Sequence, residues 1–130
     1  MYILDTNTLI YYFKGMGNVS QKLLSKSPKN IGVPAIVLYE LEVGIAKSDS
    51  PKKRMKQLQE IISLINVIPF SEKEAKVSAS IRAILEKKGT PIGPYDILIA
   101  GTALAHQAVL VSRNTSEFER VDKLQIENWY

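Results

Sequence analysis

The sequence contains no cysteine and only one histidine, His106. Without cysteine the chain can form no disulfide bond, no thiolate nucleophile and no zinc site with cysteine ligands, so its stability must come from burial alone. A chain without cysteine fits a reducing compartment. His106 lies at the end of a mostly apolar segment, which predicts a structural role for this side chain.

Long hydrophobic runs are also missing. A membrane-spanning helix needs about 20 consecutive apolar residues, and no segment of this chain approaches that length. The first residues, Met1 to Asp5, show neither the basic stretch nor the cleavage site of a secretory signal. We therefore expect a cytoplasmic protein that neither crosses a membrane nor is secreted.

The 130 residues suffice for one domain, which we expect to span residues 1–130. Hydrophobic residues make up 45% and charged residues 23%, a composition typical of a folded domain. The net charge is +4, with a local cluster at Lys52, Lys53, Arg54 and Lys56. This cluster fits a solvated helix face as well as a contact with a polyanion such as a nucleic acid.

The order of apolar runs and helix signals predicts alternating strands and helices. We expect strands at residues 2–4, 31–33, 67–70, 109–111 and 124–129. We expect helices around residues 9–13, 19–27, 34–47, 51–65, 71–88 and 95–106, with a short turn or helix holding Glu117. This alternation predicts an α/β fold whose mostly parallel sheet is covered on both faces.

Acidic and polar residues follow two of the expected strands. Asp5 comes directly after the first strand, and the segment from Ser112 to Glu117 follows the fourth. In open α/β sheets, ligands bind beyond the carboxyl ends of the strands. These residues are therefore the first candidates for a functional site.

Two further acids lie on expected helices. Helical spacing puts Glu40 on one face with Val37, Val43 and Gly44, which predicts that Glu40 points inward and Glu42 outward. Asp96 begins an almost wholly apolar helix after a loop rich in glycine and proline, and it too is expected to face the interior.

Inward-pointing acids from three separate segments suggest a shared cation, because an unpaired buried carboxylate is costly. Oxygen ligands alone favour Mg²⁺ or Mn²⁺. Each acid also has a simpler explanation. Asp5 fits the cap of the following helix, Asp96 a favourable charge in a first turn, and Glu40 the partner of a core lysine or arginine.

Four motifs, in this order, are similar to those of the PIN-domain ribonucleases and specifically of VapC-type toxins. They are Tyr2-Ile3-Leu4-Asp5-Thr6-Asn7, Leu38-Tyr39-Glu40-Leu41, Gly89-Thr90-Pro91-Ile92-Gly93-Pro94-Tyr95-Asp96 and Ser112-Arg113-Asn114-Thr115-Ser116-Glu117-Phe118. The resemblance runs from Met1 through Trp129. It implies a single PIN domain, a three-layer α/β/α sandwich around a mostly parallel sheet of about five strands.

The resemblance also implies a site. Asp5, Glu40 and Asp96 would hold Mg²⁺ or Mn²⁺ and carry catalysis. Asn114 stands at one place where these domains often have aspartate, which leaves Glu117 as the nearby fourth carboxylate and keeps the number of metals open. The supporting residues would be Thr6, Asn7, Ser112 and Asn114.

The implied activity is metal-dependent hydrolysis of phosphodiester bonds in structured RNA, leaving 5′-phosphate and 3′-hydroxyl ends. The segment from Gly89 to Asp96 resembles the subgroup that cuts initiator tRNA in its anticodon loop and so inhibits translation. The resemblance further implies a homodimer and a VapB-type antitoxin. The antitoxin's tail would occupy the groove of the toxin, and its other half would bind operator DNA.

Other interpretations are weaker. A haloacid-dehalogenase-like phosphatase would need a second acid where Asn7 stands, and PIN-like flap nucleases are larger. A catalytically silent PIN-fold domain that binds RNA or other proteins stays open. Tyr11, Tyr12 and Phe13 point in different directions on a helix, which favours core or dimer packing over a base-stacking surface.

Overall fold

A computed structural model, which describes residues 1–130, shows a five-stranded sheet in which every pairing is parallel. The strands are β1 (Tyr2–Leu4), β2 (Ile31–Pro34), β3 (Asn66–Ile68), β4 (Val109–Val111) and β5 (Gln125–Glu127), in the order β3-β2-β1-β4-β5. The prediction of an α/β fold with a mostly parallel sheet of about five strands is confirmed.

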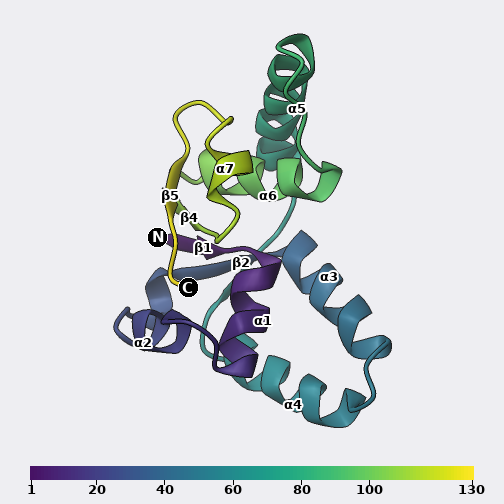
Figure 1. Cartoon of the computed structure of the whole chain (residues 1–130), viewed down its shortest axis with the longest axis vertical. Coiled ribbons are helices and arrows are strands. Elements are labelled where there is room, and N and C mark those ends of the chain that lie inside the picture. Colours follow the sequence, from purple (N-terminus) through teal and green to yellow (C-terminus); the bar gives the residue numbers. More distant parts are fainter.

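Seven helices cover the sheet. They are α1 (Thr6–Lys14), α2 (Val19–Leu24), α3 (Ala35–Ala46), α4 (Pro51–Ile62), α5 (Glu72–Lys87), α6 (Pro94–Ala105) and α7 (Thr115–Phe118), with a 3₁₀ turn η1 at Pro28–Asn30. Helices α5, α6 and α7 lie on one side of the strands and α1, α2 and α4 on the other (Figure 1). None of the helices is both long and apolar enough to span a bilayer.

The strand order creates a switch point beside β1. The chain leaves β1 toward β2 and β3 on one side, and it returns through α5 and α6 to β4 on the other side of β1. Right-handed crossovers in opposite directions put their helices on opposite faces of the sheet. The carboxyl ends of β1 and β4 therefore diverge into helices of different layers, which leaves space for a ligand between them.

Several element ends differ from the sequence prediction. Helix α1 extends beyond the predicted residues 9–13 at both ends, α4 ends at Ile62 instead of residue 65, and β3 ends at Ile68 instead of residue 70. Three other differences have a clear local cause. Helix α2 ends at Leu24 instead of residue 27, because Ser25 bonds back to the Lys22 carbonyl and Pro28 begins the 3₁₀ turn. Strand β3 begins earlier than predicted, at Asn66, whose side-chain amide donates to two carbonyl groups of the η1–β2 segment. Strand β5 ends at Glu127, because Trp129 turns back into the core.

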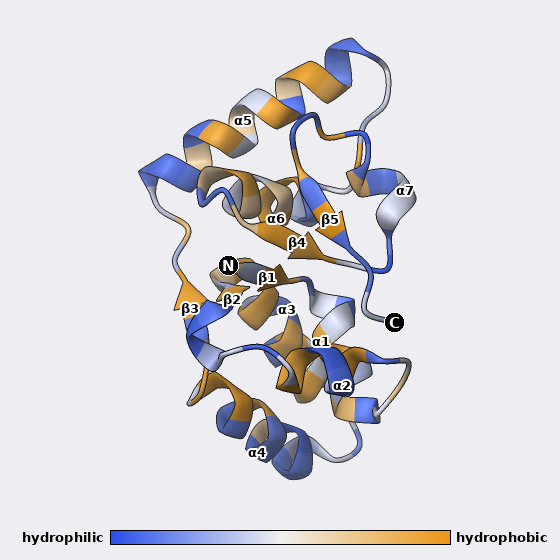
Figure 2. Ribbon diagram, turned by 90° about the vertical axis from the view of Figure 1, so that its left-hand side faces the viewer, coloured by the Kyte–Doolittle hydropathy of each residue, from blue (hydrophilic) through white to orange (hydrophobic).

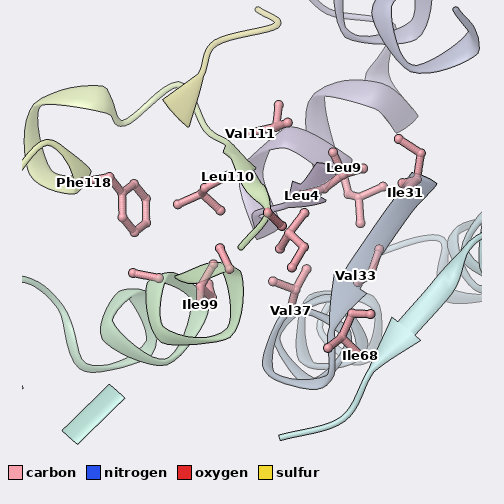
Figure 3. Close-up of a cluster of buried hydrophobic side chains, with 14 of the residues drawn as sticks. Leu4, Leu9, Ile31, Val33, Val37, Ile68, Ile99, Leu110, Val111 and Phe118 are labelled. Atoms are coloured by element: carbon pink, nitrogen blue, oxygen red, sulfur yellow. The ribbon is translucent and has the colours of Figure 1, made fainter. Parts of the chain in front are cut away.

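The core runs through both layers. Ile3, Leu4, Val33, Leu110 and Val111 of the three central strands have no exposed surface. Figure 3 shows Leu4, Val33, Leu110 and Val111 of these strands near Leu9 of α1, Val37 of α3 and Ile99 of α6. In Figure 2, β4 is orange, whereas β5 carries blue as well as orange and α4 is largely blue. Helix α6 buries Ile97 and the run from Ile99 to Ala103, as its apolar sequence predicts, while Leu98, Leu104 and Ala105 are only partly buried.

Helices α5 and α6 approach closely at Gly101. A Cβ atom placed there would lie 1.8 Å from Ser78 Oγ and 2.8 Å from Ser78 Cα. The contact thus requires glycine, because a side chain would push the two helix backbones apart. Since α6 carries Asp96 in its first turn, this contact also sets where that carboxylate lies.

We predict that Gly101→Ala lowers the free energy of unfolding by roughly 2–4 kcal/mol through overpacking of α5 against α6. The matched control is Gly44→Ala on α3, where an added Cβ meets nothing within 4 Å. The control should be neutral or stabilising by up to about 1 kcal/mol. Equal urea denaturation midpoints for the two variants would contradict the packing argument.

His106 pairs with a buried acid of α5. Its Nε2 lies 2.6 Å from Glu74 Oε2, and Glu74 also accepts hydrogen bonds from the backbone N–H and the hydroxyl of Ser71. These bonds, mainly those from Ser71, lower the pKa of Glu74 to about 2. The structural role predicted for His106 is confirmed.

Because the folded-state pKa of Glu74 lies below its ordinary value of 4.5, its carboxylate stabilises the fold above that pH, and the stabilisation fades as the pH falls toward about 2. We predict that Glu74→Gln loses about 1–3 kcal/mol at pH 7 through weaker hydrogen bonds. Urea titrations at pH 7 and pH 3 should show the difference shrinking in acid. A difference that grows in acid would contradict this assignment.

Candidate active site

Asp5 occupies the carboxyl end of β1 and caps α1. Its Oδ1 accepts a hydrogen bond of 2.9 Å from the backbone N–H of Thr8, and its side chain also contacts the Ser112 hydroxyl. The residue is only 6% exposed, and this burial raises the pKa of its carboxyl group while the hydrogen bonds partly oppose the rise. Asp5 is therefore both a helix cap and a buried acid facing β4.

Thr8 is a residue of the site that the sequence prediction missed. Its hydroxyl donates to the Val111 carbonyl at 3.0 Å, and the backbone N–H of Asp5 donates to the same carbonyl at 3.2 Å. These bonds tie the start of α1 to the end of β4. The only signal in the sequence is its position three residues after a capping acid.

Glu40 is held by Thr6 from the first turn of α1. The Thr6 hydroxyl donates to Glu40 Oε1 at 2.8 Å, as expected of a supporting residue. Glu40 itself is only half-buried, and Glu42 is exposed as predicted. The shared inward face proposed for Glu40 was wrong in part, because Val43 and Gly44 are exposed.

The reason is the way in which α3 packs. This helix buries Val37, Leu41 and Ile45, a stripe that runs beside Glu40 instead of through it. Helix α3 contacts α1 and α4 in one layer and α6 in the other. Glu40 therefore borders the space between the layers instead of entering the core.

Asp96 lies in the first turn of α6, after Gly93 and Pro94. Its pKa is raised to about 6, first by burial and then by the negative charges of Glu117, Asp5 and Glu40. The prediction that Asp96 faces the interior holds in part, since the residue is half-buried. The repulsion shows that four carboxylates from four separate segments lie close enough to act on one another.

Glu117 is oriented by Asn114. The Asn114 side-chain amide donates to Glu117 Oε2 at 3.0 Å, and its backbone N–H donates to the Ser112 hydroxyl at 3.0 Å. Ser112 in turn contacts Asp5, so the turn after β4 connects two of the acids. Asn7 is exposed, and the hydrogen bonds around Asp5 and Glu40 run through Thr6, Thr8 and Ser112 instead.

The donor set suits a hard divalent cation. All four acids offer oxygen ligands, and none of them forms an ion pair with a lysine, arginine or histidine. No three acidic or histidine side chains come together tightly enough to form a complete metal cage. The cluster is thus an open acidic site, in which a cation would offset the repulsion that raises the pKa of Asp96.

A groove of about 310 Å³ begins beside Glu40 and runs between α1, α3 and α4. Its walls include Ile10, Phe13 and Leu41, and Lys14 and Arg54 also line it. The other members of the basic cluster, Lys52, Lys53 and Lys56, are exposed on α4. The groove therefore has apolar walls, and Glu40, Lys14 and Arg54 supply its charged side chains.

Comparison with known proteins matches residues 2–124 to the PIN domain family. The chain is 35% identical to the tRNA(fMet)-specific endonuclease VapC of Salmonella typhimurium over 98% of this chain and 97% of that protein. It is 37% identical to Ribonuclease VapC2 of Rickettsia felis over 99% of this chain and 98% of that protein.

Two solved structures show the same fold. The structure of VapBC2 from Rickettsia felis bound to a DNA fragment from their promoter superposes with a TM-score of 0.93 at 34% identity, over 99% of this chain and 98% of that chain. DNA-bound VapBC from Salmonella typhimurium gives 0.93 at 35% identity, with the same coverage. The chain therefore belongs to the PIN domain family, and its relatives of nearly equal length are VapC ribonucleases.

Proposed function

We propose that this chain is a divalent-metal-dependent endoribonuclease that acts as the toxin of a toxin–antitoxin pair. The observation that carries the proposal is the convergence of Asp5, Glu40, Asp96 and Glu117 beyond the ends of β1 and β4, where burial and then the charges of the other three acids raise the pKa of Asp96. A silent domain would have no reason to keep four uncompensated carboxylates together, because their repulsion destabilises the fold.

PIN-domain ribonucleases generally depend on a divalent metal. We assign Mg²⁺ or Mn²⁺ to Asp5, Glu40 and Asp96, with Glu117 as a fourth ligand, because all of them offer carboxylate oxygens. When bound, such a cation makes a water molecule more acidic near neutral pH and offsets charge on the phosphoryl oxygens.

The chain's own residues orient the acids for this task. Thr8 and Ser112 hold Asp5, Thr6 holds Glu40, and Asn114 holds Glu117. Because the pKa of Asp96 is raised to about 6, its charged form predominates only above about pH 6. His106 is engaged with Glu74, so proton transfer by histidine has no part in the reaction.

For the substrate we propose the anticodon loop of initiator tRNA. The Salmonella typhimurium relative carries tRNA(fMet) specificity in its name and matches this chain over nearly its full length. Single-stranded loops present unstacked bases and an accessible backbone, which suits an open acidic site bordered by basic side chains. A tRNA target places the action of this chain in the cytoplasm.

For the partners we propose a VapB-type antitoxin and a second copy of this chain. The similar structures are VapBC complexes bound to DNA, in one case to a promoter fragment. The groove is suited to the antitoxin's tail, because its apolar walls include Ile10, Phe13 and Leu41 and it is also lined by Glu40, one of the four acids. Operator DNA would then be bound through the antitoxin.

The proposal is tested by incubating the purified protein with total tRNA in Mn²⁺, in Mg²⁺ or in EDTA, and by mapping new ends by sequencing. We expect cleavage in one tRNA loop that requires metal and leaves 5′-phosphate ends. Asp96→Asn should slow it by about 100-fold or more, because a ligand of the cation is lost.

The matched control is Asp122→Asn, which removes an exposed acid outside the cluster and should cut at the normal rate. If the metal-loaded protein cuts no RNA although it is folded and free of antitoxin, the proposed activity is wrong. The silent RNA-binding domain would then be the better interpretation.

Burial and the neighbouring acids disfavour the charged form of Asp96, so this residue should lower the stability of the metal-free protein at neutral pH. The pKa of Asp96 rises from 3.8 to about 6 on folding, so its stabilising contribution is complete below pH 3.8 and is lost as the pH rises through about 6. In EDTA at pH 7, Asp96→Asn should therefore be more stable than the native protein by about 1 kcal/mol, allowing for solvent screening.

Saturating Mn²⁺ should reverse that order, because it stabilises the native protein by about 2.7 kcal/mol at one hundred times the Kd. Thermal unfolding in EDTA and in Mn²⁺ measures both effects. An Asp96→Asn protein that is less stable than the native one in EDTA would show that burial and the neighbouring acids do not disfavour the charged form of Asp96 as described.

A further inference from the structure

Arg113, in the turn after β4, is an exposed cation held against two aromatic rings. The carbon of its guanidinium group lies 3.6 Å from the centre of the Tyr130 ring and 5.7 Å from that of Tyr11. The two tyrosine rings meet edge to face at 4.8 Å. Such contacts orient a guanidinium group while leaving its edge exposed to solvent.

Tyr130 is itself anchored. The Asn18 side-chain amide donates to its carbonyl oxygen at 3.4 Å. Gly17, with a φ of +62°, lets the loop between α1 and α2 approach so closely that an added Cβ would lie 2.6 Å from the Tyr130 carbonyl carbon. The aromatic support of Arg113 is therefore built from α1, the following loop and the last residue of the chain.

The position of Arg113 connects it to the acidic site. It stands between Ser112, which contacts Asp5, and Asn114, which holds Glu117. Despite these neighbours it enters none of the chain's three ion pairs. Its backbone therefore belongs to the turn that connects two of the acids. Its guanidinium group lies against the two tyrosine rings, forms no ion pair, and is free for another anion.

We propose that Arg113 binds a backbone phosphate of the RNA beside the bond that is cut, and that Tyr130 and Tyr11 hold its guanidinium group in the binding orientation. This inference rests on the proposed ribonuclease function. It assigns the positioning of the substrate to a residue outside the acidic cluster.

Charge complementarity supports a phosphate as the ligand. A polyanion that approaches four carboxylates is repelled, and a cation placed at their edge offsets part of that repulsion. The planar guanidinium group matches two phosphate oxygens at once, which a point charge does not. Because the Tyr130 ring lies against one face of the Arg113 guanidinium group, the N–H edge of that group is the side available to a phosphate.

The first test measures how RNA binding depends on salt. A fluorescein-labelled anticodon stem–loop of initiator tRNA is titrated in EDTA with Asp96→Asn protein, in which cleavage is slowed, from about 50 to about 200 mM KCl. Adding Arg113→Gln should weaken binding and reduce the slope of log K against log salt by about 0.7, the value for one phosphate contact on a single strand.

The matched control is Arg82→Gln, which removes an exposed arginine of α5 that pairs with Glu86. It should leave the slope unchanged. If Arg113→Gln has the same slope as its parent, Arg113 contacts no phosphate and the inference is overturned. A purely structural role would lower stability without changing the slope.

The second test uses the active protein and asks whether the aromatic ring of Tyr130, and not its hydroxyl group, supports Arg113. Tyr130→Phe keeps the aromatic support and should leave KM within about twofold, whereas Tyr130→Leu removes it and should raise KM by about threefold with kcat little changed. Equal KM values for the two variants would overturn the supporting role of Tyr130. Arg113→Lys should not rescue Arg113→Gln fully, because two-point binding is lost.

The two hypotheses fail in different ways. If the native protein cuts RNA but Arg113→Gln cuts it equally well with the same KM, only the phosphate contact is wrong. If protein with native Arg113 neither binds nor cuts RNA, both the proposed function and the role of Arg113 are wrong.

Discussion

Repulsion among four carboxylates at one edge of a parallel sheet is the constraint on which the site of this protein depends. Asp5 is held in place by bonds from Thr8 and Ser112, and Asp96 is fixed by the first turn of a buried helix. The backbones of the two acids are thus set by β1 and by α6. The fold therefore keeps unfavourable charge at this edge, and in the proposed function a bound cation offsets it, which would couple metal binding to stability.

The architecture explains how such a cluster is assembled. The crossover from β1 to β2 and the crossover from β3 to β4 run in opposite directions along the sheet, so α1 and α6 lie in different layers. The first turns of these two helices bring Asp5 and Asp96 close enough to act on one another. The close contact of Ser78 with Gly101 sets the depth of α6, while the bond from Thr8 to Val111 sets the start of α1. The packing of helices far from the acids thus decides how near the acids come to one another.

Much of this arrangement was predictable from local patterns. Strand ends followed by polar residues identified Asp5 and Ser112, and the Gly-Pro loop identified the start of the helix that carries Asp96. The burial of Glu40 was predicted less well. Helical spacing groups residues into faces, but it does not tell which of two adjacent stripes the neighbouring helices will cover, and α3 buries the stripe beside Glu40.

Three features follow from the amino-acid order alone: the succession of strands and helices, the capping role of Asp5 and the apolar nature of α6. They do so because each depends on residues within a few positions of one another. Three others require the folded chain: the pairing of Glu74 with His106, the hydrogen bond from Thr8 to Val111 and the contact of Arg113 with the Tyr130 ring. The first two pairs lie 32 and 103 residues apart in the chain. No local pattern encodes such contacts, since they arise only when the layers close over the sheet.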